Sequence, residues 1–259
     1  MNPTPSAPPA RVDVPLSDLP AEGDVFSTSW KLATSDMDAR QHLRLDGVAR
    51  YIQEVGAEHL VDANAEHVHP YWIVRRAVVD VVEPLTWPNE VTFHRWCSAV
   101  GTRSCTMRVR LQGANGGRIE TEGFWTNLDK DTLTPSLITD GFFNRLATTT
   151  EEHQLKWHPW LPDPVPKGSA SFSFPLRHTD IDFFQHLNNT NYWHAVHEVL
   201  ARYPKIGTAP YRAVVEYRRP ITHDEPVTIR HCLSDASVRF WFCVGDEVRA
   251  AAMAARLTP

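Results

Sequence analysis

The spacing of apolar residues predicts a long helix near the start of the chain, surrounded by strands. Over residues 45–61, Val48, Ile52, Val55 and Leu60 recur at close to helical spacing. An opening strand precedes this helix, and strand-like stretches and one short helix follow it. The strands are expected over residues 26–32, 71–82, 91–97, 104–111 and 118–127, and the short helix over 141–146.

The second half of the chain shows the same order of elements. A helical pattern over residues 192–203 contains Tyr192, Val196, Val199 and Tyr203. The predicted strands around it cover residues 170–176, 211–218, 227–232, 238–244 and 248–257.

Two short blocks of sequence each occur twice, in the same order. The block D-x-D-x-x-Q-H-L begins at Asp36 and again at Asp180, an offset of 144 (180 minus 36). The block R-A-V-V, followed by an acidic residue, begins at Arg76 and at Arg212, an offset of 136 (212 minus 76). Two matches in one order indicate a duplication. Each copy has the element order of a hot-dog fold, so we predict an α+β tandem (double) hot-dog whose copies pair edge to edge.

Proline-rich stretches mark the expected domain limits. We expect a disordered tail over residues 1–22 and an N-terminal hot-dog domain over residues 23–158. A proline-rich linker over residues 159–167 and a C-terminal hot-dog domain over residues 168–259 follow, because prolines favour an extended connection over a helix.

Composition narrows the class of protein. The 259 residues are 42% apolar, which suits a sizeable core, and a net charge of −5 gives no support to nucleic-acid binding. No apolar run is long enough for a membrane span, and the N-terminus lacks the apolar segment of a signal peptide. The four cysteines form no C-x-x-C pair and fit a reducing compartment, so we expect a cytoplasmic protein.

The residues best suited to chemistry lie just before the second long helix. Asp182 and His186 can supply a base and an acid. Asn188 or Asn189 is expected to cap the helix, whose free N–H groups can hold a developing oxyanion. This set suits hydrolysis of an ester or thioester. The alternative is that Asp182 and the asparagines only cap the helix and that His186 is structural.

The pattern D-x-D-x-x-Q-H-x-N-N-x-x-Y, with V-E-Y-R-R further on, resembles the second half of acyl-ACP thioesterases of the plant and bacterial type. The resemblance covers roughly residues 23–259 and implies hydrolysis of fatty acyl thioesters, on acyl carrier protein (ACP) or CoA, to free fatty acid. By motif it implies catalytic roles for Asp182 and His186 and a substrate-binding role for Asn188 and Asn189, with no metal or other cofactor.

The same resemblance places the acyl chain in the first copy, in a tunnel under the first long helix. Trp72 and Trp96 are candidates for its wall. The basic pairs Arg75-Arg76 and Arg218-Arg219 are candidates to meet the acidic surface of ACP. Whether the chain forms a homodimer stays open.

Several positions depart from the family pattern. Phe184 replaces an asparagine of the family, and Pro220 and Ile221 replace a glutamate and a cysteine. The departures keep two alternatives open: a non-hydrolytic acyl-binding protein, and a hot-dog hydratase or dehydratase, whose D-x-N-P-x-H motif is nevertheless absent. The first copy replaces the Asn pair by Arg44 and Leu45, so no second working site is expected there.

Overall fold

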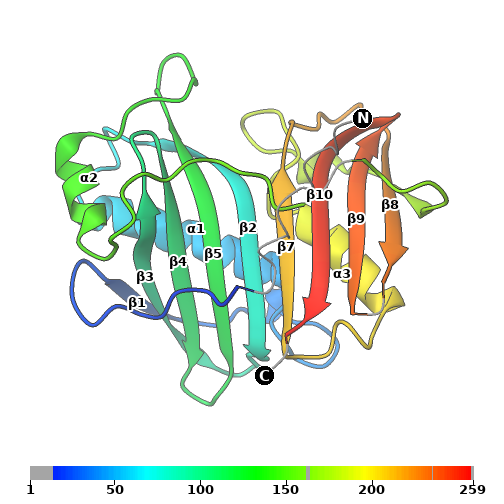
Figure 1. The fold of residues 1–259 in the computed structure, drawn as a ribbon. Coiled ribbons are helices and arrows are strands. Elements are labelled where there is room, and N and C mark those ends of the chain that lie inside the picture. Colours follow the sequence, from blue (N-terminus) through cyan, green and yellow to red (C-terminus); the bar gives the residue numbers. More distant parts are fainter. Residues whose placement is uncertain (1–13, 162–163, 235, 258–259) are drawn as a thin grey trace, which may run out of the picture.

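The computed structural model describes residues 14–161, 164–234 and 236–257, which form one ten-stranded antiparallel sheet with two long helices on one face (Figure 1). The strand order is β1-β3-β4-β5-β2-β7-β10-β9-β8-β6. The first repeat consists of β1 (Phe26–Lys31), α1 (Leu45–Asp62), β2 (Tyr71–Glu83), β3 (Glu90–Val100), β4 (Ser104–Gly113), β5 (Arg118–Leu128) and α2 (Asp140–Ala147). The second consists of β6 (Ala170–Phe174), α3 (Tyr192–Arg202), β7 (Tyr211–Tyr217), β8 (Val227–Leu233), β9 (Ser237–Val244) and β10 (Glu247–Arg256).

This architecture confirms the predicted tandem hot-dog. In Figure 1, α1 crosses behind the strands of the first repeat and α3 behind those of the second, while α2 lies at the outer end of the first repeat. The two repeats meet where β2 pairs with β7, so the predicted edge-to-edge pairing is also confirmed.

The repeated block R-A-V-V-acid forms this seam between the repeats. Because β2 and β7 run antiparallel, the block pairs with its own copy: Arg76 lies opposite Glu216, and Asp80 lies opposite Arg212. The Arg212 guanidinium donates from Nε and Nη2 to the two Asp80 carboxylate oxygens, at 2.6 and 2.7 Å. Each copy thus supplies one arginine and one carboxylate, which makes the sequence self-complementary across the seam.

Chain segments outside the repeats cover the outer face of the sheet. The Val14 carbonyl accepts a hydrogen bond from Arg212, and the Ser17 carbonyl accepts one from Arg108. The buried Glu216 carboxylate accepts the backbone N–H groups of Trp160 and Leu161, at 2.7 and 3.1 Å. The predicted tail and linker therefore contain segments bonded to the sheet, whereas residues 1–13 and 162–163 lie outside the described residues.

The interiors of the two repeats are filled differently. Under α3, a cluster of aromatic side chains occupies the space between helix and sheet, and the Tyr192 and Phe242 ring centroids lie 4.8 Å apart. Under α1, Gly56 and Gly123 present no side chain to the interior, and a pocket remains. Helix length adds to this difference, because α1 has 18 residues and α3 has 11.

Within the described part of the chain, no helix has the length and apolar character needed to cross a membrane. Cys97, Cys105, Cys232 and Cys243 are all free thiols.

Candidate active site

The block D-x-D-x-x-Q-H-L folds into the same loop in both copies. Asp182 Oδ1 accepts the backbone N–H groups of Phe184 and His186, at 2.9 and 3.3 Å. Asp38 Oδ1 does the same in the first copy, from Arg40 and His42, at 2.8 Å each. The repeated Gln has a left-handed backbone in both loops, with φ of 65° and 62°. The shared residues thus build the loop, and any difference in chemistry has to come from its surroundings.

The loop leads into α3 at Tyr192, where the predicted helical pattern begins, but a residue other than those expected lies at its N-cap position. Asn188 Oδ1 accepts the backbone N–H and the hydroxyl of Thr190, at 2.9 and 2.8 Å, and so stabilises a turn. The helix begins only at Tyr192, with Asn191 at the N-cap position and no side-chain cap. The prediction that Asn188 or Asn189 caps the helix is therefore wrong, because an intervening turn uses the Asn188 side chain.

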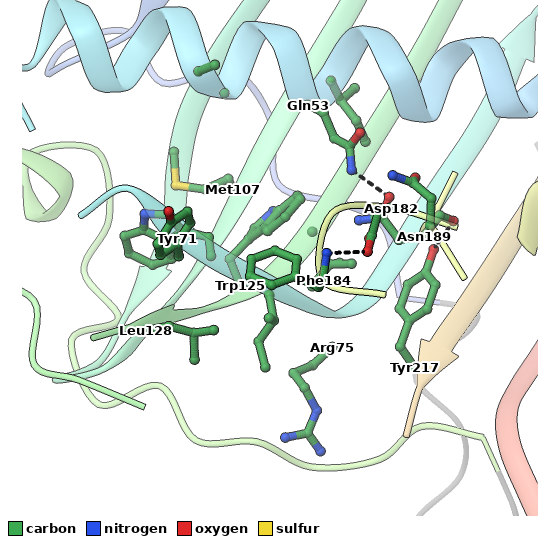
Figure 2. A pocket seen from close by; sticks show the side chains of 18 of the residues that line it. Gln53, Tyr71, Arg75, Met107, Trp125, Leu128, Asp182, Phe184, Asn189 and Tyr217 are labelled. Carbon is green, nitrogen blue, oxygen red and sulfur yellow. Dashed lines mark hydrogen bonds between the residues drawn. The ribbon is translucent and has the colours of Figure 1, made fainter. Parts of the chain in front are cut away.

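One pocket of about 660 Å³ brings the predicted site residues together (Figure 2). It lies between α1 and the strands of the first repeat, and the second-copy loop closes one end. Asp182, His186, Asn188 and Asn189 all line it. Most of its wall is apolar and includes Ile52, Leu60, Trp72, Met107, Val109 and Leu128. This volume lies within the roughly 300–1,000 Å³ common for small-molecule sites.

Of the two tryptophans expected in the tunnel wall, only Trp72 lines the pocket. Trp96 is fully buried elsewhere, with the Arg108 guanidinium 5.1 Å from its ring centroid. Successive side chains of a strand point to opposite faces, so Arg95 faces the pocket and Trp96 faces away. The expectation for Trp96 is therefore wrong.

Asn189 is held from both repeats. Gln53 on α1 donates to Asn189 Oδ1 at 2.5 Å, and the Tyr217 hydroxyl donates to the Asn189 carbonyl at 3.1 Å. Figure 2 shows Gln53 and Tyr217 on opposite sides of Asn189. Burial raises the pKa of Tyr217, which keeps its phenol protonated as a donor. Neither Gln53 nor Tyr217 was identified as a site residue from the sequence. Tyr217 belongs to the V-E-Y-R-R string, which indicated the family but no role for this residue.

The Asn189 N–H makes no hydrogen bond to any described residue. At the equivalent place in the first copy, the Leu45 N–H donates to Nε2 of His197, at 2.7 Å. Leu45 and Gln53 correspond to Asn189 and His197 at the repeat offset of 144. The same backbone donor thus bonds to an imidazole in the first copy, whereas in the second it has no partner among the described residues and belongs to a residue that lines the pocket.

Asp182 and His186 are available to a ligand. Asp182 Oδ1 accepts two N–H groups, and no described residue donates to Oδ2. The half-buried His186 imidazole makes no side-chain hydrogen bond with the described residues and no ion pair with Asp182. One carboxylate oxygen, one imidazole and one backbone N–H therefore border the same end of an apolar pocket.

Aromatic rings surround this end of the pocket. Phe184 lines it, and its ring centroid lies 4.1 Å from Phe183 and 5.7 Å from Tyr71. Phe183 is 73% exposed. Phe184 therefore contributes a hydrophobic surface where the family pattern has an amide.

The basic pairs differ in their exposure. Arg76 is buried on the outer face of the sheet, 3.7 Å from the Trp160 ring centroid, so it is not available to a carrier surface. Arg218 donates to the Leu161 carbonyl at 3.0 Å, and burial lowers its pKa. Arg219 lies at the pocket with a side chain that is 68% exposed and is paired with Glu247.

Residues 23–146 match the family model for the acyl-ACP thioesterase N-terminal domain, and residues 166–244 match that for the C-terminal domain. The chain belongs to the acyl-ACP thioesterase family. A Mycobacterium tuberculosis protein described as uncharacterized, found in two strains, is 59% identical over 246 residues, which cover 95% of this chain and 98% of that protein. Chloroplastic oleoyl-ACP thioesterase 1 of Arabidopsis thaliana is 22% identical over 241 residues, or 82% of this chain and 65% of the plant protein.

Solved structures of acyl-ACP thioesterases show the same fold. The 12:0-ACP thioesterase of Umbellularia californica aligns with a TM-score of 0.69 at 19% identity, over 92% of this chain and 98% of its own. An acyl-ACP thioesterase from Bacteroides thetaiotaomicron aligns with a TM-score of 0.71 at 12% identity, over 89% and 97%. Family membership supports thioester hydrolysis at the level of the family.

Proposed function

We propose that this acyl-ACP thioesterase family member hydrolyses fatty acyl thioesters to free fatty acids, with Asp182 and His186 as its catalytic residues. The supporting observation is an apolar pocket lined at one end by Asp182, His186 and Asn189, whose N–H has no partner among the described residues. The acyl chain lies under α1, and the thioester lies against the second-copy loop.

In this proposal, Asp182 Oδ2 takes a proton from a water molecule as that water attacks the thioester carbonyl carbon. The carbonyl oxygen becomes an oxyanion, which accepts a hydrogen bond from the Asn189 N–H. When the C–S bond breaks, His186 donates a proton to the leaving thiolate. Asn188 shapes the turn, and Asn189 is positioned by Gln53 and Tyr217.

The duplicated loop offers a matched test of Asp182. Asp182→Asn and Asp38→Asn each keep an oxygen that accepts the same two N–H groups, so both should cost similar stability. Only Asp182→Asn removes a carboxylate from the pocket, and we expect it to lower turnover of acyl-CoA or acyl-ACP by about 100-fold or more. Asp38→Asn should keep near wild-type turnover. Equal turnover in the two variants, measured by thiol release, would contradict the proposed role.

A second candidate function is acyl binding without hydrolysis. Phe184 and Pro220 line the pocket where the family pattern has polar residues, which favours this alternative over the hydratase. The same thiol-release assay separates the two functions. A fatty acid that binds the wild-type protein while acyl thioesters remain uncleaved would establish a binding protein.

We also propose ACP as the carrier and the cytoplasm, within fatty acid biosynthesis, as the setting. Arg219 is an exposed cation at the pocket, where the acidic surface of ACP would dock. The free cysteines are consistent with a reducing compartment.

A further inference from the structure

A charged residue faces the apolar pocket far from the proposed catalytic loop. Arg95 lies on β3 and lines the pocket beside Gly56 of α1. Tyr71 of β2 borders the loop, and the sheet order places β4 and β5 between β3 and β2. Three strand spacings separate these two strands by about 14 Å. Arg95 therefore lies near the far end of a chain that enters from the loop.

The Arg95 guanidinium has donors to spare. Its Nη1 approaches Nδ1 of His59, and His59 Nε2 lies 3.2 Å from Asp24 Oδ2. Since Arg95 can only donate, His59 accepts at Nδ1 and donates from Nε2 to Asp24. No carboxylate of the described residues forms an ion pair with Arg95 itself. Burial lowers the pKa of Arg95, but a guanidinium remains cationic.

The second copy fills the equivalent positions with a neutral pair. At the repeat offsets, His59 and Arg95 correspond to Tyr203 and His231, whose hydroxyl and Nδ1 atoms lie 3.1 Å apart. The fold therefore does not require a cation here. The copy with a closed interior has neutral groups, and the copy with an open pocket has a guanidinium. A cation at the end of an apolar pocket is costly unless an anion pairs with it.

We propose that the pocket takes acyl chains that bear a carboxylate at the end remote from the thioester, and that Arg95 binds this carboxylate. This inference rests on the proposed function for the position of the thioester, at the second-copy loop. The binding of the remote carboxylate by Arg95 does not depend on hydrolysis. A guanidinium matches a carboxylate in two parallel hydrogen bonds. Gly56 presents no side chain on the pocket side of Nε and Nη2, where even a hypothetical Cβ would stand 3.8–3.9 Å away without a clash.

The test compares methyl esters in a binding assay, so that the two ligands differ only in the remote carboxylate. The monomethyl esters of decanedioic, dodecanedioic and tetradecanedioic acids are titrated into the full chain by calorimetry, each beside the methyl ester of the monocarboxylic acid of equal length. At the best length, the ester that bears the remote carboxylate should bind about 10- to 100-fold more tightly, which is the usual contribution of hydrogen bonds to a charged group. Thioesters with and without a terminal carboxylate then report the same preference in turnover.

Two variants assign the preference to Arg95. Arg95→Met removes the charge at similar length, and His59→Tyr with Arg95→His copies the neutral pair of the second repeat, which this fold already contains. Both should bind the two esters equally. The proposal is overturned if the wild type shows no preference or binds neither ester, or if either folded variant keeps the preference. A wild type that prefers the carboxylate-bearing ester but does not hydrolyse acyl thioesters would refute only the proposed function.

Discussion

Replacement of His197 by phenylalanine tests how much the hydrogen bond between the Leu45 N–H and the His197 ring contributes to stability. The His197 Nε2 atom accepts the N–H of Leu45, the first residue of α1, at 2.7 Å. Phenylalanine keeps a ring of similar size but has no acceptor, so this N–H loses its partner. The perturbation lies where α3 meets α1, away from the proposed catalytic loop.

The expected cost follows from that one hydrogen bond. Loss of an acceptor at a helix N-terminus costs about 0.5–2 kcal/mol, and a buried unsatisfied donor costs about 1–3 kcal/mol. Because His197 is only half-buried, we expect about 1–2 kcal/mol. For a chain of this size, that lowers the Tm by roughly 2–8 °C.

The cost should also depend on pH. Burial is the main cause that lowers the pKa of His197; Arg44 and His194 act in the same direction, whereas Asp46 and Asp38 oppose them. A lowered folded pKa means that the neutral ring contributes stability above its unfolded pKa of about 6.5, and that this contribution is lost as pH falls through the folded pKa. The difference between wild type and variant should therefore shrink on acidification.

Urea denaturation followed by tryptophan fluorescence, at pH about 7.5 and about 5.5, measures both effects. His67→Phe is the control, because that side chain is 92% exposed and should change stability little at either pH. Equal stability of wild type and His197→Phe at neutral pH, or a difference that grows in acid, would refute this reasoning.

Two further predictions concern the pocket. A Cβ at Gly123 would lie 2.3 Å from Nε1 of Trp125, so Gly123→Ala should push the indole into the pocket. Turnover of the longest accepted acyl chain should then fall about 10-fold relative to turnover of shorter chains. Gly141→Ala is the control, because open space surrounds Gly141 and turnover should not change. Arg219→Glu should slow acyl-ACP turnover several-fold more than acyl-CoA turnover. Added salt should slow acyl-ACP turnover of the wild type in the same way. Equal losses on both carriers would argue against ACP docking at Arg219.

The two repeat offsets, 144 and 136, predict individual hydrogen bonds as well as the fold, because equivalent residues of the two copies make equivalent contacts. The Leu43 and Leu187 N–H groups donate to the carbonyls of Leu85 and Ile221, which the second offset of 136 relates to each other. The apolar spacing placed the start of α3 at Tyr192 correctly, but sequence could not identify its N-cap, since the Asn188 side chain forms a turn rather than a cap.

The sequence also could not predict which copy contains open pocket space and which has a filled interior. This difference depends on Gly56 and Gly123 facing the interior of one copy while Tyr192 and Phe242 fill the other, and this is decided by packing across strands far apart in the chain. Arg95 escaped notice for the same reason: a single arginine within a strand gives no sign of facing inward.

The self-complementary seam has a consequence for how this protein can change over evolution. Two identical subunits joined through such a seam would carry every mutation in both halves of the assembly. Joining the halves in one chain removes that obligation, so His197 can block one backbone donor while Gln53 leaves the other open. The two halves can therefore specialise: the first repeat keeps the pocket, and the second repeat supplies the loop that closes one end of it. Neither half, separated from the other, would contain a whole site.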